Sequence, residues 1–358
     1  MNMAKLLIIL LLFASTAYTA PNHFRLWFPQ YRDPFERYIK NCMTTYDAYR
    51  KSLPCHPVNY GGCQSGRMVH CLLSQATESL KANMASASVV LGVLPTTLSL
   101  VGSTTVETGL LALRRPFLAL LLACGTPAVS PVRSFEYRDP IDLLRKTPTT
   151  IDLPKFDPLS ATVIVIFQYI FALAAVANLA HVSWELSVKT VCSFSSDSEF
   201  QPALWGFLAI VIHLIGCIAV VLRYRCQSTE SNPNERAWAR RIKTELKLNV
   251  QHSTTTLHIQ KETSLLILWS WCTSTGTVLH IMYGTLVFSS ILFISAQDAV
   301  KVAARYLGST LVCRAILMFE IMGMRTVIVN QVEVVVLEAP SERIQRAAAE
   351  STERKPNA

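Results

Sequence analysis

Residues 101–125, "VGSTTVETGLLALRRPFLALLLACG", decide how the chain crosses a membrane. The stretch is apolar enough for a membrane helix except at Glu107, Arg114 and Arg115. Each arginine at the centre of a bilayer would cost about 2.5 to 3.5 kcal/mol on insertion scales. The stretch is therefore a poor candidate for a simple membrane span.

A helix start is encoded inside this stretch. Gly102 and Ser103 interrupt the apolar run, and a new helix is expected from about residue 105. Thr104 followed by Glu107 matches the capping box, in which a hydroxyl and a carboxylate satisfy the free amides at a helix N-terminus. Pro116 either ends this helix or opens another, since proline is favoured at the first helical position.

The composition of the chain favours a membrane protein. Of 358 residues, 51% are hydrophobic and 16% are charged, whereas about 25% are charged in a typical soluble domain. Long runs without Asp, Glu, Lys or Arg can each cross about 30 Å of hydrocarbon, and several such runs are improbable as buried helices of a soluble protein. We expect an all-α, polytopic helical membrane protein with spans at about 84–101, 161–182, 203–222 and 265–295.

The N-terminus has the features of a secretory signal peptide. Lys5 precedes the apolar block "LLIILLLFA", and Ser15 and Ala17 occupy the minus-three and minus-one positions of a cleavage site. Residues 1–17 are therefore predicted to be a signal peptide, with an uncleaved anchor helix as the alternative. In either case residues 18–83 form a small lumenal or extracellular segment.

That segment is predicted to contain disulfides. It carries four cysteines, namely Cys42, Cys55, Cys63 and Cys71. The lumenal side is oxidising, so two disulfides are expected, and three connectivities are open. Histidines beside two of the cysteines raise zinc as an alternative, but the spacing lacks the CxxC pairs of common structural sites.

The distribution of basic residues predicts the orientation. The loop 223–264 has eight Lys or Arg against four Glu, whereas the loop 183–202 has one Lys against three acidic residues. The positive-inside tendency places the former in the cytoplasm and the latter outside. Counting back, the loop 126–160 is also cytoplasmic, so the chain between residues 84 and 125 crosses the membrane an odd number of times.

One crossing is enough to satisfy this count. We therefore expect residues 84–101 to span the membrane. Residues 105–125 are then expected to lie as an interfacial helix at the cytoplasmic surface, with Arg114 and Arg115 directed toward lipid headgroups.

The C-terminal apolar stretch is ambiguous. Residues 299–324 contain Lys301, Arg305, Arg314 and Glu320. These charges favour an interfacial helix and four spans in total. If Arg314 instead pairs with a carboxylate within the bundle, a fifth span forms and the tail, residues 326–358, is cytoplasmic. The tail is predicted to be partly disordered.

Polar residues inside the spans are candidates for an intramembrane site. Asn178, His181 and Glu185 recur at spacings of three and four, which places them on one helical face. His213 and His280 lie well inside the third and fourth spans. Together they could form a proton relay, a metal or haem site, or a path for a polar solute. The plainer interpretation, interhelical hydrogen bonding worth under about 1 kcal/mol each, is preferred.

Several function classes are disfavoured. The formal charge of +9 comes mostly from loops beside the apolar runs, so no basic face for nucleic acid is indicated. Walker, GxSxG, HExxH and dinucleotide-binding motifs do not occur. No catalytic residue, metal or cofactor is predicted, and an enzymatic function is disfavoured.

The segments "LRRP" (113–116) and "YRDP" (137–140) carry a resemblance. With the sequence around them, over roughly residues 70–325, the chain resembles uncharacterised multipass membrane proteins of filamentous ascomycete fungi. The resemblance implies a fungal host and a multipass topology. It implies no activity, and no site residue is transferred from it.

These features together predict a non-enzymatic sensor or scaffold in a membrane of the secretory pathway, most simply the plasma membrane. The bilayer and a cytoplasmic protein at 105–160 or 223–264 are the expected partners, because the unusual residues concentrate in interfacial and loop segments. The alternatives are an ion or small-solute transporter or channel that uses the intramembrane His and Asn residues, and a haem-bearing intramembrane oxidoreductase.

Overall fold

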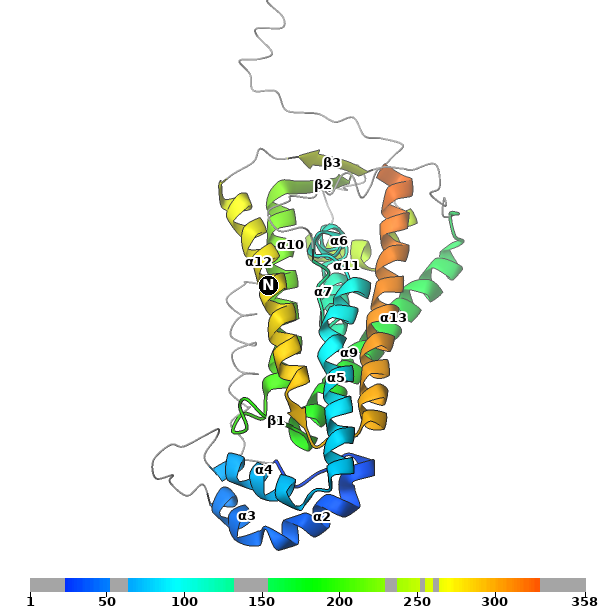
Figure 1. Cartoon of the computed structure of the whole chain (residues 1–358). Helices are drawn as coiled ribbons and strands as arrows, with labels where there is room; N and C mark the ends of the chain where they lie inside the picture. Colours follow the sequence, from blue (N-terminus) through cyan, green and yellow to red (C-terminus); the bar gives the residue numbers. More distant parts are fainter. Residues whose placement is uncertain are drawn as a thin grey trace, which may run out of the picture.

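The protein is a bundle of long helices with a small helical domain at one end (Figure 1). The computed structural model describes residues 23–51, 64–131, 154–228, 237–251, 255–259 and 264–328. Within these, five helices are long and apolar enough to cross a membrane. They are α5 (Glu78–Val101), α9 (Pro158–Lys189), α10 (Gln201–Arg223), α12 (Ser264–Ser289) and α13 (Ala296–Ile328).

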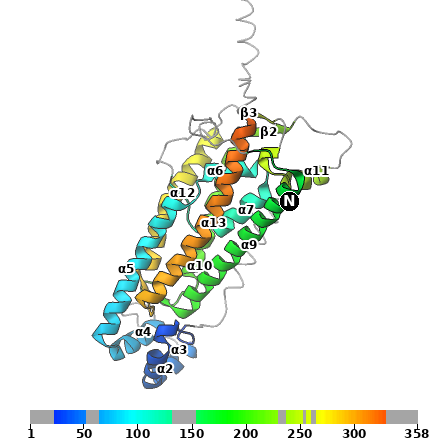
Figure 2. The ribbon, with the colours of Figure 1, turned by 90° about the vertical axis from the view of Figure 1, so that its right-hand side faces the viewer.

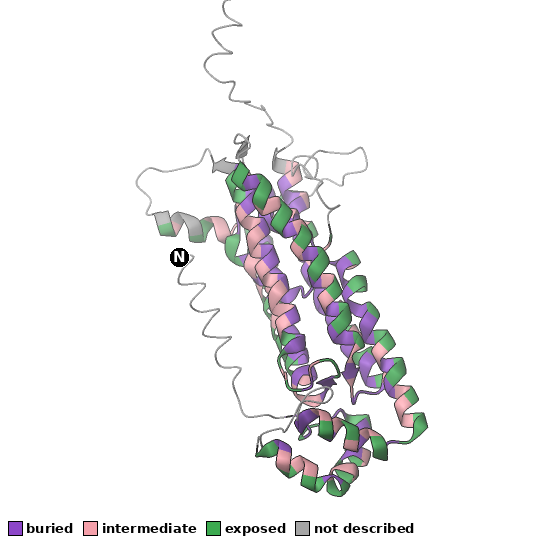
Figure 3. Cartoon of the chain, turned by 60° about the vertical axis from the view of Figure 1, so that its left-hand side comes forward, coloured by how far each residue is buried: buried purple, intermediate pink, exposed green. Residues whose placement is uncertain are grey.

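The outer faces of these helices are apolar, as a bilayer requires. On α9, Phe167, Ile170 and Phe171 are each more than half exposed, while Ala172 and Ala175 face the interior and are buried. Figure 3 shows the same division along the bundle, with exposed residues outside and buried residues between the helices. A helix that is apolar on all sides would expose an unfavourable apolar surface to water. It is stable when other helices cover one face and lipid covers the other.

The N-terminal domain is a cluster of short helices around an aromatic core. The elements are η1 (Pro29–Tyr31), α2 (Arg32–Asn41), α3 (Met43–Arg50) and α4 (Gln64–Gln75). Phe35 is fully buried and stacks on Trp27 at 4.8 Å between ring centroids. Phe293, from the chain between α12 and α13, meets the Phe35 ring edge to face at 5.1 Å. This contact fastens the domain to the bundle.

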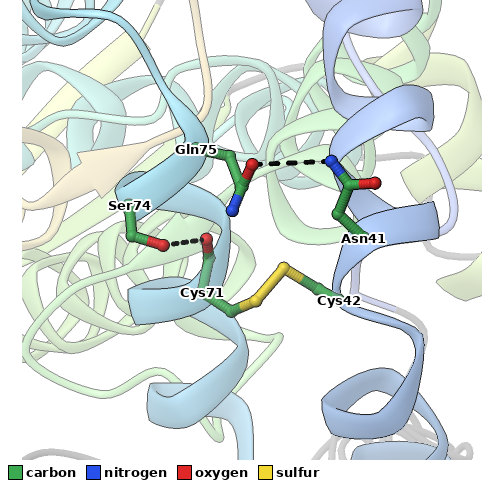
Figure 4. The surroundings of a disulfide bond; sticks show 5 residues. All are labelled: Asn41, Cys42, Cys71, Ser74 and Gln75. Atoms are coloured by element: carbon green, nitrogen blue, oxygen red, sulfur yellow. Dashed lines mark hydrogen bonds between the residues drawn. A yellow bond between two sulfur atoms is a disulfide. The ribbon is translucent and has the colours of Figure 1, made fainter.

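One of the predicted disulfides is present in this domain. Cys42 at the end of α2 is bonded to Cys71 in α4, with 6.2 Å between their Cα atoms (Figure 4). Cys55 and Cys63 lie outside the described residues. The bond between Cys42 and Cys71 removes both of these cysteines as zinc ligands.

The two ends of the bundle are marked by short strand pairs. At the end next to the N-terminal domain, β1 (Val191–Cys192) pairs antiparallel with β4 (Ile291–Leu292). At the opposite end, β2 (Tyr224–Ser228) pairs with β3 (Thr255–Ile259), near α11 (Ala237–Glu245) and η2 (Asn249–Gln251). The loop predicted to be outside therefore lies at the same end as the cysteine-containing domain, which is consistent with the predicted orientation (Figure 1).

The segment 105–125 does not form one interfacial helix. It forms α6 (Thr105–Ala112) and α7 (Pro116–Gly125), joined by a tight turn and packed inside the bundle. The predicted capping box at Thr104 and the proline start of α7 are both present. Apolar residues of both short helices are buried against α9, α10 and α13, among them Leu110, Leu111, Leu118 and Leu122.

The structure has five candidate spans, which favours the five-span alternative over four spans. The preferred hypothesis had four spans and an interfacial helix at 299–324, but α13 stands within the bundle between α5 and α9 (Figure 2). This is the five-span alternative, in which Arg314 pairs with a carboxylate. The reason is electrostatic, because the charges of α13 find partners on helices packed around it.

Five spans predict the side on which the tail lies. The described part of α13 ends beside η2, since a Cβ built on Gly323 would lie 2.9 Å from the Val250 nitrogen. We expect glycosylation acceptor sites engineered near residues 230 and 350 to stay unmodified, while a site near residue 57 is modified. The native chain has no N-x-S/T sequon, so the background is clean. Modification near residue 350 but not near residue 230 would instead indicate the four-span topology.

The N-terminal domain is predicted to lose stability in acid. His23 is 2% exposed, and burial lowers its pKa to about 4, although the nearby Asp197 opposes the shift. The unfolded chain binds this proton at about pH 6.5, so the stabilising contribution is lost as the pH falls from about 6.5 to about 4.

Thermal unfolding of the full chain, followed by tryptophan fluorescence, should show this pH dependence. His23→Leu should weaken it over that range. Equal pH dependence in the variant and the native chain would mean that another group is responsible.

Candidate functional site

The helix that enters the bundle first is broken inside it. α5 ends at Val101, and α6 begins at Thr105 after an extended Gly102. The chain that follows α7 returns to this break, where the Ser130 amide donates to the Ser103 carbonyl at 3.0 Å. A Cβ on Gly102 would lie 2.8 Å from the Ala128 carbonyl oxygen, so only glycine permits this close approach.

Extended backbone at this depth is unusual in a membrane protein. Residues 126–129 are all buried, and they pack against α10 and the core of the bundle. Backbone that is not helical is tolerated within a bilayer only where protein or a water-filled cavity surrounds it. The break and the returning segment therefore place non-helical backbone and small polar side chains inside the bundle.

A charged pair lies at this break. The Glu107 carboxylate accepts from the Thr104 amide at 2.9 Å, which completes the capping box, and it also accepts from the Arg314 guanidinium of α13. Glu107 is 9% exposed. One carboxylate thus neutralises the N-terminus of α6 and the charge of an arginine within a candidate span.

His213 lies next to this pair. It is fully buried in α10, and its Nδ1 lies 2.9 Å from the hydroxyl of Thr108 on α6. The Thr108 hydroxyl also reaches the Thr104 carbonyl at 2.9 Å. When that hydroxyl donates to the carbonyl, Nδ1 of His213 must donate to the hydroxyl oxygen. Nε2 of His213 has no hydrogen-bond partner among the residues that the structure describes, and it then carries a free lone pair inside the bundle.

His280 on α12 has the complementary arrangement. Its Nε2 lies 2.8 Å from the Trp205 carbonyl oxygen, which can only accept, so Nε2 carries the proton. Nδ1 has no hydrogen-bond partner and therefore also carries a free lone pair. The ring stacks on the Trp205 indole with 5.1 Å between centroids. Gly284 leaves the space for that indole, because a Cβ there would overlap it.

A second buried charged pair lies closer to the end of the bundle that carries α11. Arg115 and Glu320 have fully buried side chains and meet at 2.8 Å. Gln168 accepts from Arg115 at 2.8 Å and donates to Glu320 at 2.6 Å. The Arg115 Nε donates to the Glu245 carbonyl at 2.8 Å, and its guanidinium lies 5.6 Å from the centre of the Tyr169 ring.

The expected direction of Arg114 and Arg115 toward lipid headgroups is therefore wrong. Arg114 is 5% exposed, and its two terminal nitrogens have no hydrogen-bond partner. The physical reason is the position of Glu320, which supplies the counter-charge to Arg115 from a helix that the four-span hypothesis left outside the bundle. The sequence signal for this pairing was the matching set of charges in 105–125 and 299–324.

The other sequence candidates form a separate cluster. Asn178, His181 and Glu185 all contact Arg305 of α13, with donor to acceptor distances of 2.9 Å, 3.0 Å and 2.5 Å respectively. Lys189 adds a second cation beside Glu185 at 2.5 Å. Each polar group here has a partner, and the structure does not bring this cluster to His213 or His280. Arg305 lies at the centre of this cluster, although it was not among the residues predicted for the intramembrane site.

The arrangement offers no evident metal centre. Among the residues that the structure describes, no group of three or more His, Cys, Asp or Glu side chains could hold a metal ion. Five cysteines are free thiols, namely Cys124, Cys192, Cys217, Cys272 and Cys313, so the buried Cys192 and Cys313 are not bonded to each other.

The fold and this buried polar core define a polytopic helical integral membrane protein. Comparison with known protein families, with characterised proteins and with solved structures finds no match to this chain. The function must therefore be argued from the site itself.

Breaking the Arg115–Glu320 pair should destabilise the bundle strongly. Arg115→Ala leaves the Glu320 carboxylate buried without its cation, which should cost about 3 to 5 kcal/mol of unfolding free energy. Lys81→Ala removes an exposed pair with Glu78, whose side chain is 90% exposed, and should cost less than about 1 kcal/mol. Unfolding of the detergent-solubilised protein by denaturant, followed by circular dichroism, measures both.

A paired substitution separates charge from packing. Arg115→Met combined with Glu320→Met removes both buried charges and should recover most of the loss, since no unpaired ion remains. If Arg115→Ala is no more harmful than Lys81→Ala, the pair is not an important source of stability.

Proposed function

We propose that this protein is an ion or small-solute transporter or channel whose site is the break between α5 and α6. The observation that carries the proposal is the pair of buried histidines, His213 and His280, each with one ring nitrogen that lacks a partner. A buried polar atom without a partner is costly, and such atoms are retained where function requires them.

The broken helix supports this assignment. Many secondary transporters bind their substrates near the middle of the bilayer, at helices that are interrupted there. In this chain the interruption coincides with the returning segment 126–131 and with Glu107. Backbone groups, a carboxylate and a guanidinium are thus available within a few residues of each other, on elements that helical packing holds in place.

The chemistry of the site favours protons as the transported or coupled species. A free imidazole lone pair can accept a proton from a neighbouring group or a water molecule and pass one on. The Arg314–Glu107 pair can take part in the same step. A proton or cation would compete with Arg314 for the Glu107 carboxylate, whereas an anion would compete with Glu107 for Arg314.

The sensor or scaffold hypothesis loses part of its support. It was based on unusual residues in interfacial and loop segments, and two of these residues, Arg114 and Arg115, are only 5% and 0% exposed. A haem centre is less well supported than a transport site, because Nε2 of His280 is engaged with the Trp205 carbonyl and its ring lies against the indole. The fungal origin and the plasma-membrane location stay predictions from the sequence.

The test is proton flux in liposomes that contain the purified full chain. We expect a pH-driven flux above that of protein-free liposomes. His213→Gln combined with His280→Gln keeps neutral side chains with hydrogen-bonding amides but removes both basic nitrogens, and should reduce the flux to the protein-free level. His181→Gln is the matched control, because its side chain is 56% exposed and belongs to the Arg305 cluster.

Two results would overturn the proposal. One is a native chain that carries no protons, alkali cations or chloride faster than protein-free liposomes. The other is undiminished flux in the double variant. The melting temperature of each variant shows whether a loss of flux reflects unfolding.

A further inference from the structure

The helix α11 presents an apolar stripe that no part of the described chain covers. Trp238, Ile242 and Leu246 are 61%, 51% and 56% exposed. They recur at intervals of four, so they share one side of the helix and of the turn that follows it. Three adjacent large apolar side chains that are each more than half exposed mark a contact surface for lipid or protein.

The helix is fixed at the end of the bundle. The Glu245 carboxylate accepts from the Leu118 amide and from the Tyr169 hydroxyl, each at 2.8 Å. Just beyond it, Leu248 and Val250 are buried against Ala161 and Val165 of α9. The anchor holds the C-terminal end of α11, while the rest of the helix projects beside the start of α9 (Figure 2).

The charge around the stripe is strongly positive. Residues 237–247 contain four basic residues, namely Arg240, Arg241, Lys243 and Lys247. The single acidic residue in this stretch, Glu245, is directed into the bundle. A short amphipathic helix with a tryptophan on its apolar side and Lys or Arg around it is suited to the boundary between headgroups and acyl chains.

We propose that α11 is a membrane-surface element that binds anionic phospholipid. The stripe enters the acyl boundary of the leaflet that surrounds this end of the bundle, and the basic residues contact the negative headgroups. Lipid is favoured over a protein partner because the anchor places the helix next to the lipid-facing surface of α9. Each basic residue near an anionic surface contributes about 1 kcal/mol to such binding. This proposal does not depend on transport.

The experiment measures the depth of Trp238 in vesicles. The native chain and the variant Trp238→Phe are reconstituted in phosphatidylcholine vesicles with brominated acyl chains, with and without phosphatidylserine. The difference between the two fluorescence signals reports Trp238 alone. Trp271→Phe is the control, because Trp271 is 51% exposed on the lipid-facing side of α12 and should be quenched in both vesicles.

We expect Trp238 to be quenched more strongly in vesicles that contain phosphatidylserine. Arg240→Glu combined with Lys243→Glu should remove the difference. Lys81→Glu, at the opposite end of the bundle, should leave it unchanged. Trp238 that is never quenched would favour a protein partner and overturn the proposal. Equal quenching in both vesicles would refute recognition of anionic lipid.

Discussion

The structure depends on two buried ion pairs that join segments far apart in the sequence. Glu107, in the first turn of α6, pairs with Arg314 of α13, and Arg115, directly before α7, pairs with Glu320 of α13. Each charge alone would be costly inside a bilayer, and each pair reduces that cost by satisfying the ions with one another. The two pairs hold α6 and α7 inside the bundle and α13 across it. Without them, neither segment could remain at this depth.

These two ion pairs explain the irregular course of the chain between α5 and α9. Two short helices and an extended segment occupy the space that one straight helix would fill elsewhere. The leucines of α6 and α7 supply apolar contacts with α9, α10 and α13, and the charged pairs fix the register. The same arrangement leaves Thr108, His213 and the returning backbone together at the break. The ion pairs that neutralise the buried charges therefore also position the residues of the candidate site.

Two of the polar clusters in the membrane domain, the Arg305 cluster and the histidines, differ in how many of their polar atoms have hydrogen-bond partners. Around Arg305, every polar side chain that the sequence singled out has a partner, which fits a structural role. By contrast, His213 beside the break and His280 on α12 each have one ring nitrogen without a hydrogen-bond partner among the described residues. Such a contrast within one bundle is what directs attention to the histidines. The sequence pattern suggested the opposite emphasis, because Asn178, His181 and Glu185 have the more regular spacing.

The sequence alone predicts the helical membrane architecture, because several long uncharged runs are stable together only in the hydrocarbon core of a bilayer. It also determined the helix start at Thr104, since a capping box acts over four residues. That α13 is a fifth candidate span and that Arg115 is buried became clear from the packing of the helices. Hydropathy assigns a cost to each charge separately, whereas the real cost depends on a partner about 200 residues away along the chain. The charges in 105–125 and 299–324 made such a pairing conceivable, but a local pattern does not specify which residues meet across this distance.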